Sequence, residues 1–201
     1  MLLPALNQAK DNSKEEVCIS NLKQLAAALQ RYCQDYDDWL PLSQTSEKKW
    51  TDFLDPYTGT NRDLRFKYDT STPYHCPAAL ELHSGFKKTA GNTYGVNGYT
   101  LGRQDFIAEA GEWTEMDVVP QYKLKGLLHP DKCMAFGDGH WNAETKSWEI
   151  MIDINSWAIP EFLHDGGANF VFFDGHVEWK KSSDVPSDKS DVFWWPHGNR
   201  K

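Results

Sequence analysis

The chain has 201 residues, of which 40% are hydrophobic and 25% charged, a composition typical of one globular domain with a sizeable core. Its formal net charge of −8 and pI near 5.3 argue against nucleic-acid binding, because contacts to phosphate need clustered Lys and Arg side chains. No run approaches the roughly 18 consecutive apolar residues needed to span a bilayer, so we expect the chain as given to be soluble.

Residues 4–36 predict one long helix with a single apolar face, because apolar or small side chains recur there at three- and four-residue spacing. At 1.5 Å per residue this helix is about 45 Å long and extends past a small domain. Asp37 and Asp38 oppose the helix dipole, and Pro41 cannot continue the helix, so we expect it to end near Asp37. The apolar face comprises Leu22, Leu25, Ala26, Leu29, Tyr32, Cys33 and Tyr36.

The first residues, Leu2 to Leu6, form a short apolar segment that enters the helix without a polar cap. One hypothesis is that a longer apolar segment precedes Leu2 in the full-length protein. The alternative is a native start codon followed by a frayed helix end.

The four cysteines show no C-x-x-C spacing, and therefore no zinc or thioredoxin-like signature. Cys18 and Cys33 lie about 22 Å apart on the predicted helix, which is too far for a disulfide. Cys76 with Cys133 is the simplest candidate pair, and four free thiols are the alternative.

The strongest local signal is a β-hairpin near the C-terminus. Residues 168–173 and 176–179 are β-prone, and Asp174-Gly175 between them predicts a type I′ turn, which needs positive φ at both central residues. The apolar cluster at residues 192–195 is expected to dock on the body. Before this hairpin, the patterns predict a short helix at 48–57 ended by Pro56 and Gly59, a loop at 61–77, a strand or glycine-bent loop at 92–99, and irregular chain at 100–119. A β-rich half is predicted from residue 123, with a turn at 129–132 and strands at 133–136 and 148–154.

Several segments together resemble one family. They are residues 18–24 (CISNLKQ), 36–41 (YDDWLP), 74–77 (YHCP) and 123–138, with His164 followed after nine residues by Asp174-Gly175. The chain closely resembles the prepilin-type proteins whose C-terminal region is named for this His-x9-Asp-Gly pattern, a prepilin processing-associated branch related to type II secretion pseudopilins and type IV pilins.

The resemblance implies a pilin-like α+β fold. The N-terminal helix (1–40) would pack its C-terminal half on an antiparallel sheet of a globular domain (41–201) that includes the 164–175 motif. The implied function is a structural subunit of a type II secretion or type IV pilus-like assembly and not an enzyme. The implied partners are other pilin-like subunits, the secretion or pilus machinery, and prepilin peptidase acting on a full-length precursor. The membrane would be contacted only through a missing N-terminal segment, and the protein would be extracytoplasmic, anchored in the cytoplasmic membrane or in a cell-surface filament.

The candidate site residues have competing interpretations. His and carboxylate side chains are typical of metal or acid–base sites, but their spacing here is not diagnostic, and a structural role in fixing the hairpin is favoured. No catalytic motif occurs, so no catalytic residue is assigned. The candidate site residues are His164, Asp165, Asp174 and His176, together with Asp138 and His140 of a second Asp-Gly-His sequence.

Two ligands come into question. Calcium follows from the resemblance, because the major pseudopilins bind it in a loop near the C-terminal sheet, and Asp184, Asp188 and Asp191 are oxygen ligands in that region, although a solvated acidic tail is favoured. Carbohydrate follows from the aromatic content: Trp113, Trp141, Trp194 and Trp195 would stack on sugar rings if exposed, which makes a membrane-anchored, extracytoplasmic carbohydrate-binding domain the alternative function.

Overall fold

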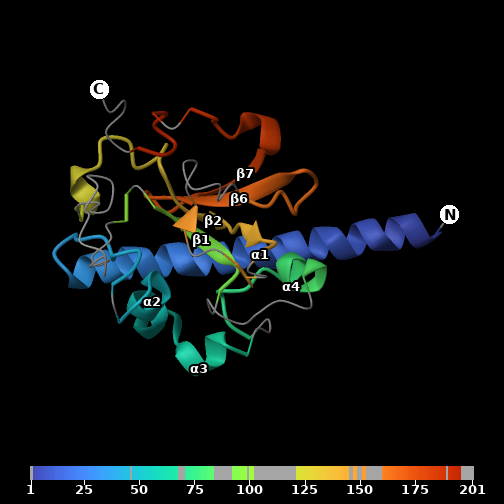
Figure 1. The fold of residues 1–201 in the computed structure, drawn as a ribbon, viewed down its shortest axis with the longest axis horizontal. Coiled ribbons are helices and arrows are strands. Elements are labelled where there is room, and N and C mark those ends of the chain that lie inside the picture. Colours follow the sequence, from blue (N-terminus) through green and yellow to red (C-terminus); the bar gives the residue numbers. More distant parts are fainter. Residues whose placement is uncertain are drawn as a thin grey trace.

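The computed structural model describes residues 2–45, 47–67, 71–83, 92–98, 100–101, 121–144, 147–148, 151–152, 160–188 and 190–195. A long N-terminal helix runs along one side of a sheet, with shorter helices beside it (Figure 1). The helices are α1 (Leu2–Asp35), α2 (Trp50–Thr58), α3 (Arg62–Arg65) and α4 (Pro77–Leu82), with the 3₁₀ turns η1 (Leu124–Gly126) and η2 (Ser182–Asp184). The strands are β1 (Tyr94–Asn97), β2 (Met134–Asp138), β3 (Trp141–Asn142), β4 (Ser147–Trp148), β5 (Met151–Ile152), β6 (Gly167–Phe172) and β7 (Val177–Lys181).

The main sheet has the strand order β5-β1-β2-β6-β7. The neighbours from β1 to β7 are antiparallel, and only the edge strand β5 runs parallel to β1. The fold is therefore mixed helix and sheet, with a long N-terminal helix and a mainly antiparallel sheet, as the α+β prediction required. β3 and β4 form a separate antiparallel pair.

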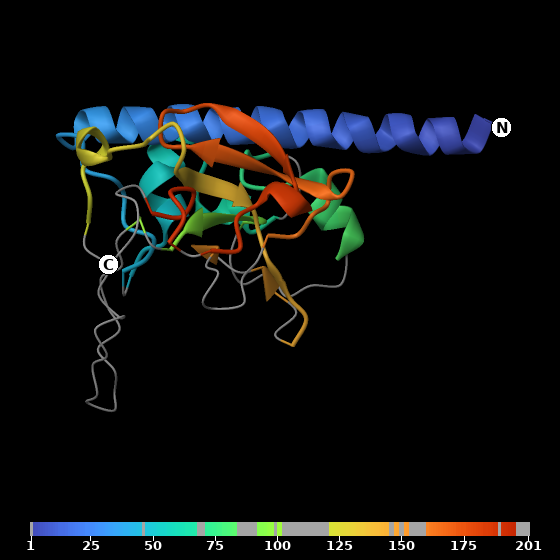
Figure 2. The same ribbon diagram turned by 90° about the horizontal axis from the view of Figure 1, so that it is seen from above.

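Helix α1 has a buried part and an exposed part. The predicted apolar face packs inward from Leu22 to Cys33, and Cys18 is buried as well, whereas residues 3–13 are exposed and the N-terminal end of the helix extends beyond the body (Figures 1 and 2). Tyr36 departs from the predicted face, because the helix ends at Asp35 and Tyr36 is 53% exposed. Asp37 and Asp38 follow with positive φ, which ends the helix where predicted. No described helix is both long enough and apolar enough to cross a membrane.

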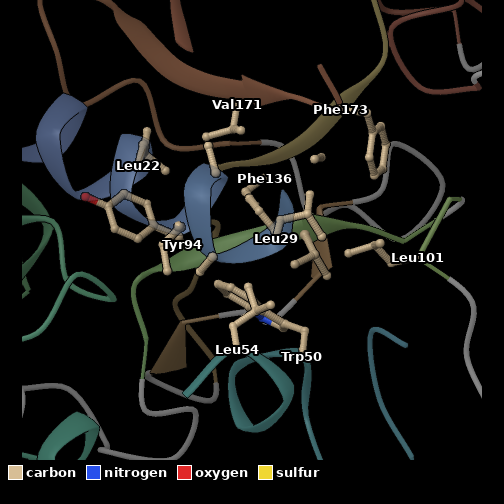
Figure 3. Packing of buried hydrophobic residues seen from close by; sticks show 14 of the residues in the cluster. Leu22, Leu29, Trp50, Leu54, Tyr94, Leu101, Phe136, Val171 and Phe173 are labelled. Carbon is tan, nitrogen blue, oxygen red and sulfur yellow. The ribbon is translucent and has the colours of Figure 1, made fainter. Parts of the chain in front are cut away.

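The core lies between α1 and the sheet. Leu22 and Leu29 of α1 meet Phe136 of β2 and Val171 of β6, and Trp50 closes the cluster from α2 (Figure 3). Alternate side chains of β6 point to the other face of the sheet, as a period of two requires. There they form a second cluster with the C-terminal segment, which confirms the predicted docking of residues 192–195. Its members are Met134, Ala168, Phe170, Phe172, Phe193 and Trp194.

Several local predictions were wrong. The predicted loop at 61–77 contains α3, which begins where the Asn61 side chain accepts from Leu64 N–H (3.0 Å), and α4 starts at Pro77. Pro56 lies inside α2, and Gly59 (φ +68°) alone ends that helix. The predicted strand at 148–154 is divided between β4 and β5, which belong to different sheets; residues 149–150 and 153–154 lie outside the described residues. Within the predicted strand or glycine-bent loop at 92–99, Tyr94–Asn97 form strand β1, residue 99 lies outside the described residues, and so does most of 100–119.

The predicted hairpin is present, but its turn is of another type. Phe172 N–H donates to the His176 carbonyl (3.0 Å) and Gly175 N–H donates to the Phe172 carbonyl (2.9 Å), which leaves residues 173–175 as a three-residue loop. Gly175 has φ +96°, whereas Asp174 is not among the described residues with positive φ. The loop therefore matches a type I turn closed by a left-handed glycine, and the type I′ prediction is corrected.

Replacing Gly175 by Val is expected to destabilise the protein by more than about 1 kcal/mol, because a β-branched residue is strained at positive φ. Urea unfolding measures the effect. Gly126→Val is the matched control, since Gly126 has no atom within 4 Å of an added Cβ and does not have positive φ. Equal stability of the Gly175 variant and the control would contradict the turn assignment.

Candidate functional site

The two parts of the His-x9-Asp-Gly motif lie at opposite ends of β6. His164 precedes the strand, and Asp174-Gly175 follows it. Six strand residues at about 3.3 Å each separate these ends by about 20 Å. The structure therefore does not bring His164 together with Asp174 or His176 in one metal or acid–base site.

His164 is held in a tight reverse turn. Its N–H and carbonyl exchange hydrogen bonds with Gly167 (3.0 and 2.9 Å), and both central residues, Asp165 (φ +50°) and Gly166 (φ +74°), have the positive φ of a type I′ turn. Trp179 of β7 donates from Nε1 to the His164 carbonyl (2.8 Å). The ring of Trp179 would lie 2.3 Å from a Cβ at Gly167, so only glycine fits there. These contacts fix the position of the His164 side chain.

The imidazole of His164 is 3% exposed and faces two partners. Its Nε2 lies 3.4 Å from Cys76 Sγ and 3.6 Å from Asp138 Oδ2. Asp138 is the last residue of β2, and its Oδ2 also accepts from Asn169 N–H (2.7 Å). Its Oδ1 is buried and has no hydrogen-bond partner in the part of the chain that the structure describes. The buried surroundings of His164 thus contain its partner carboxylate, Asp138, and the Cys76 sulfur.

Cys76 forms a disulfide with Cys18 of α1. The suggested Cys76–Cys133 pair is therefore wrong, because β2 places Cys133 elsewhere in the core while α4 begins against α1. Cys33 and Cys133 are buried free thiols, and burial raises the pKa of each to about 12. Beside the disulfide, the Asn21 amide donates to the His75 carbonyl (2.9 Å). The CISN and HCP segments thus meet at this point.

The far end of β6 is bonded to α1. Gln30 donates from Nε2 to the Phe173 carbonyl (2.8 Å), and Asp174 N–H donates to the Pro130 carbonyl (3.1 Å). Asp174 Oδ1 lies 2.6 Å from His176 Nδ1 on the exposed side of the turn. Cys18 and Gln30 are twelve residues apart, or about 18 Å along a helix, which matches the length of β6. One end of β6 is therefore bonded to α1 directly through Gln30, whereas the His164 end reaches α1 only through its contact with the Cys18–Cys76 disulfide.

Sequence reasoning missed the roles of Cys18, Asn21 and Gln30. Asn21 did carry a signal, because it follows Cys18 by three residues and precedes Leu25 by four, which places a polar side chain on the apolar face. A buried polar side chain requires a hydrogen-bond partner. Nothing local indicates that the partner is the His75 carbonyl, 54 residues away.

The charge on His164 has a stability consequence. Burial by itself lowers the pKa of His164, but the Asp138 carboxylate, assisted by Glu15, outweighs burial and raises that pKa above its usual value. The folded protein therefore holds the His164 proton more tightly than the unfolded chain does. The resulting stabilisation is complete below the ordinary His pKa and is lost as pH rises through the folded pKa.

We expect Asp138→Asn to flatten this part of the pH profile, because the amide does not favour the charged imidazole. The measurement is the free energy of unfolding from about pH 5 to about pH 9, on both sides of the ordinary His pKa. Wild type and variant should differ most at low pH. The exposed pair His176 and Asp174 offers a control in Asp174→Asn. An identical pH slope in wild type and Asp138→Asn would contradict the pairing.

The residues considered for calcium make local contacts. Asp188 Oδ1 accepts from Ser190, Asp191 Oδ1 from Phe193 N–H, and Asp184 Oδ1 from the Ser183 hydroxyl. Among the described residues they do not belong to a cluster with metal-ligand geometry, and the calcium site stays a prediction. A melting temperature that is indifferent to calcium against chelator would remove it.

The tryptophans considered for sugar stacking do not form an exposed platform in the described part. Trp194 is 2% exposed and donates from Nε1 to the Pro186 carbonyl (3.0 Å). Trp195 is half-buried against the second core cluster, and Trp141 is half-buried with its ring stacked on His83 (centroids 4.1 Å apart). Trp113 lies outside the described residues.

No family model, curated protein or solved structure matches this chain. The prepilin-type assignment therefore depends on the sequence resemblance alone. Cys18, Asn21, His75, Cys76 and His164 belong to three of the resembling segments and lie in one buried neighbourhood.

Proposed function

We propose that the protein is a pseudopilin-like structural subunit of a type II secretion or type IV pilus-like assembly. The observation that supports this most is the division of α1 into two functional parts. Residues from Cys18 to Cys33 pack on the sheet, whereas residues 3–13 are all exposed, with Leu3 at 73% and Leu6 at 68%. A helix that extends from a domain with exposed leucines is suited to packing against other helices.

The attachment of α1 to the body also fits a subunit held through its helix. A load on the exposed part of α1 must reach the sheet without pulling the helix away. The Cys18–Cys76 disulfide makes one covalent link, and Gln30 bonds the far end of β6. Glu81 of α4 binds Lys10 (2.9 Å) and Lys14 (2.7 Å), which supports the helix just before it leaves the body.

The disulfide supports the proposed location. Disulfides persist in oxidising compartments and are rare in reducing ones. We propose that the protein is extracytoplasmic, either anchored in the cytoplasmic membrane or assembled in a surface filament. Its partners would be other pilin-like subunits and the secretion or pilus machinery, with prepilin peptidase acting on the full-length precursor. The role is assembly and not catalysis.

The proposal predicts that the exposed part of α1 is the assembly surface. Leu6→Asp, introduced into the full-length gene in its own cell, is expected to reduce recovery of the subunit in sheared surface filaments by at least about tenfold, since a buried carboxylate in an apolar helix contact costs more than 1.4 kcal/mol. Leu128→Asp is the matched control, because Leu128 is also exposed, at 65%, but lies on the globular body. Equal recovery of both variants would contradict the proposal.

A further inference from the structure

The buried cluster at His164 contains three side chains of the types that bind metal ions. Cys18, Cys76 and His164 offer two sulfurs and one imidazole nitrogen, and these three atoms lie within 4.8 Å of one another. This is the only group of three or more His, Cys, Asp or Glu residues with metal-ligand geometry among the described residues. All three side chains are buried.

We propose that, after reduction of the Cys18–Cys76 disulfide, Cys18, Cys76 and His164 form a binding site for a borderline-soft divalent cation of the Zn²⁺ class. The proposal concerns the reduced protein, whereas the proposed function concerns the oxidised protein, and the two are tested separately. In the oxidised protein the two sulfurs are bonded to each other and are not thiolate ligands. The site is therefore available only in the reduced state.

The distances suit a tetrahedral ion. With metal–sulfur bonds of about 2.3 Å and metal–nitrogen bonds of about 2.0 Å, tetrahedral angles place a sulfur and a nitrogen ligand about 3.5 Å apart. Cys76 Sγ and His164 Nε2 are 3.4 Å apart. The two sulfurs need only separate from bonding distance to about 3.8 Å, a change that reduction itself brings about.

Asp138 lies beside this group. Its carboxylate adjoins His164 Nε2 at 3.6 Å, and its buried Oδ1 has no hydrogen-bond partner among the described residues. A buried carboxylate oxygen without a partner is costly in a folded protein, and a cation in the adjoining site would relieve that cost. Asp138 does not belong to the group of mutually close ligand atoms, so we place it as a neighbouring carboxylate whose charge favours the cation, while its Oδ2 keeps the bond from Asn169 N–H.

A cleft adjoins this cluster at His164. It lies between α1, α4 and the turn that carries His164, with a volume of about 310 Å³, enough for several waters at roughly 30 Å³ each. Asp11, Glu15 and Asp165 line it against one cation, Lys14, and His164 forms part of its wall. A mainly acidic cleft that has a ligand residue in its wall favours the approach of a hydrated cation.

Formation of the site requires reduction of the disulfide. A dithiol reductant supplies two electrons and two protons, so the protein disulfide becomes two thiols while the reductant forms its own disulfide. The cation then binds both sulfurs as thiolates and displaces their two protons to solvent, and His164 binds through Nε2 as the neutral imidazole.

The test uses Co²⁺ as the probe and the oxidised protein as its own control. The full chain is reduced with dithiothreitol, freed of reductant without oxygen and titrated with Co²⁺. We expect one equivalent to bind with a thiolate charge-transfer band and the visible bands of tetrahedral cobalt, and Zn²⁺ to displace it. The oxidised protein, which retains Cys33 and Cys133 as thiols, should show neither band.

Further readouts separate this site from the other thiols. Zinc X-ray absorption of the reduced wild-type protein should give two sulfurs and at least one imidazole, and Asp138→Asn should weaken zinc affinity by about 10- to 100-fold. Cys33→Ala should leave cobalt binding unchanged. Equal cobalt spectra of oxidised and reduced protein, a zinc shell without imidazole, or a reduced chain that is unfolded and does not refold with metal would each overturn the proposal.

Discussion

Replacing Cys18 and Cys76 by Ala is expected to lower the free energy of unfolding by about 4 kcal/mol. The disulfide closes a loop with a sequence separation of 58 residues, and the loss of loop entropy in the unfolded chain corresponds to about that value. This loss is a large share of the free energy of unfolding of a typical domain, which is about 5–15 kcal/mol. We therefore expect the variant to remain folded but to be much less stable. Urea unfolding of the double variant against oxidised wild type gives the difference.

Cys33→Ala is the control for the loss of a buried cysteine without loss of a cross-link, since Cys33 is a buried free thiol on the same helix. It should cost clearly less than the double variant. Reduction of the wild-type protein should reproduce the effect of the double substitution. A double variant as stable as Cys33→Ala would contradict the assigned pairing.

Replacing Arg65 by Leu is expected to cost about 3–5 kcal/mol, because it removes one partner from a buried network of charges. Arg65 is 1% exposed; its guanidinium binds the Asp52 carboxylate, and Nε lies 3.0 Å from Asp55 Oδ1. Burial raises the pKa of Asp55 even with Arg65 present, which shows how costly the charge of this carboxylate is there. Without the guanidinium, Asp55 would be left uncompensated.

Arg62→Leu is the matched control, because Arg62 belongs to the same helix but is exposed, with its guanidinium over the Phe66 ring. It is expected to change stability by less than about 1 kcal/mol. The Arg65 variant should also lose less stability at low pH, where Asp55 is protonated in both states and no buried charge remains. A cost of Arg65→Leu that equals that of Arg62→Leu would contradict the importance of this network.

Local patterns predicted the parts of the fold that depend on neighbouring residues. The buried face of α1, its end before Asp37 and the β6–β7 hairpin all follow from periodicity and turn residues. The short helices α3 and α4 were missed because four to six residues show no clear period. The turn at Asp165-Gly166 has the same Asp-Gly signal as the hairpin, but it was missed because no β-prone run precedes it.

The candidate site was less predictable than the fold, because long-range contacts assemble it. His164 was selected from its spacing to Asp174, yet β6 holds these residues apart, and its partners Cys76 and Asp138 come from other segments. The cysteine pairing failed for a similar reason: sequence spacing excludes Cys18 with Cys33 but contains no information on which helix approaches α1. Only the packing of α4 on α1 determines the Cys18–Cys76 pair.

We propose that the exposed part of α1 packs against like subunits in an assembly. The most direct measurement is the intact mass of the full-length gene product expressed in its own cell, determined in the fraction that sediments with sheared surface filaments. We predict recovery of the protein in that fraction, at a mass reduced by an N-terminal leader. A full-length, unprocessed protein that is absent from the filament fraction would contradict the account.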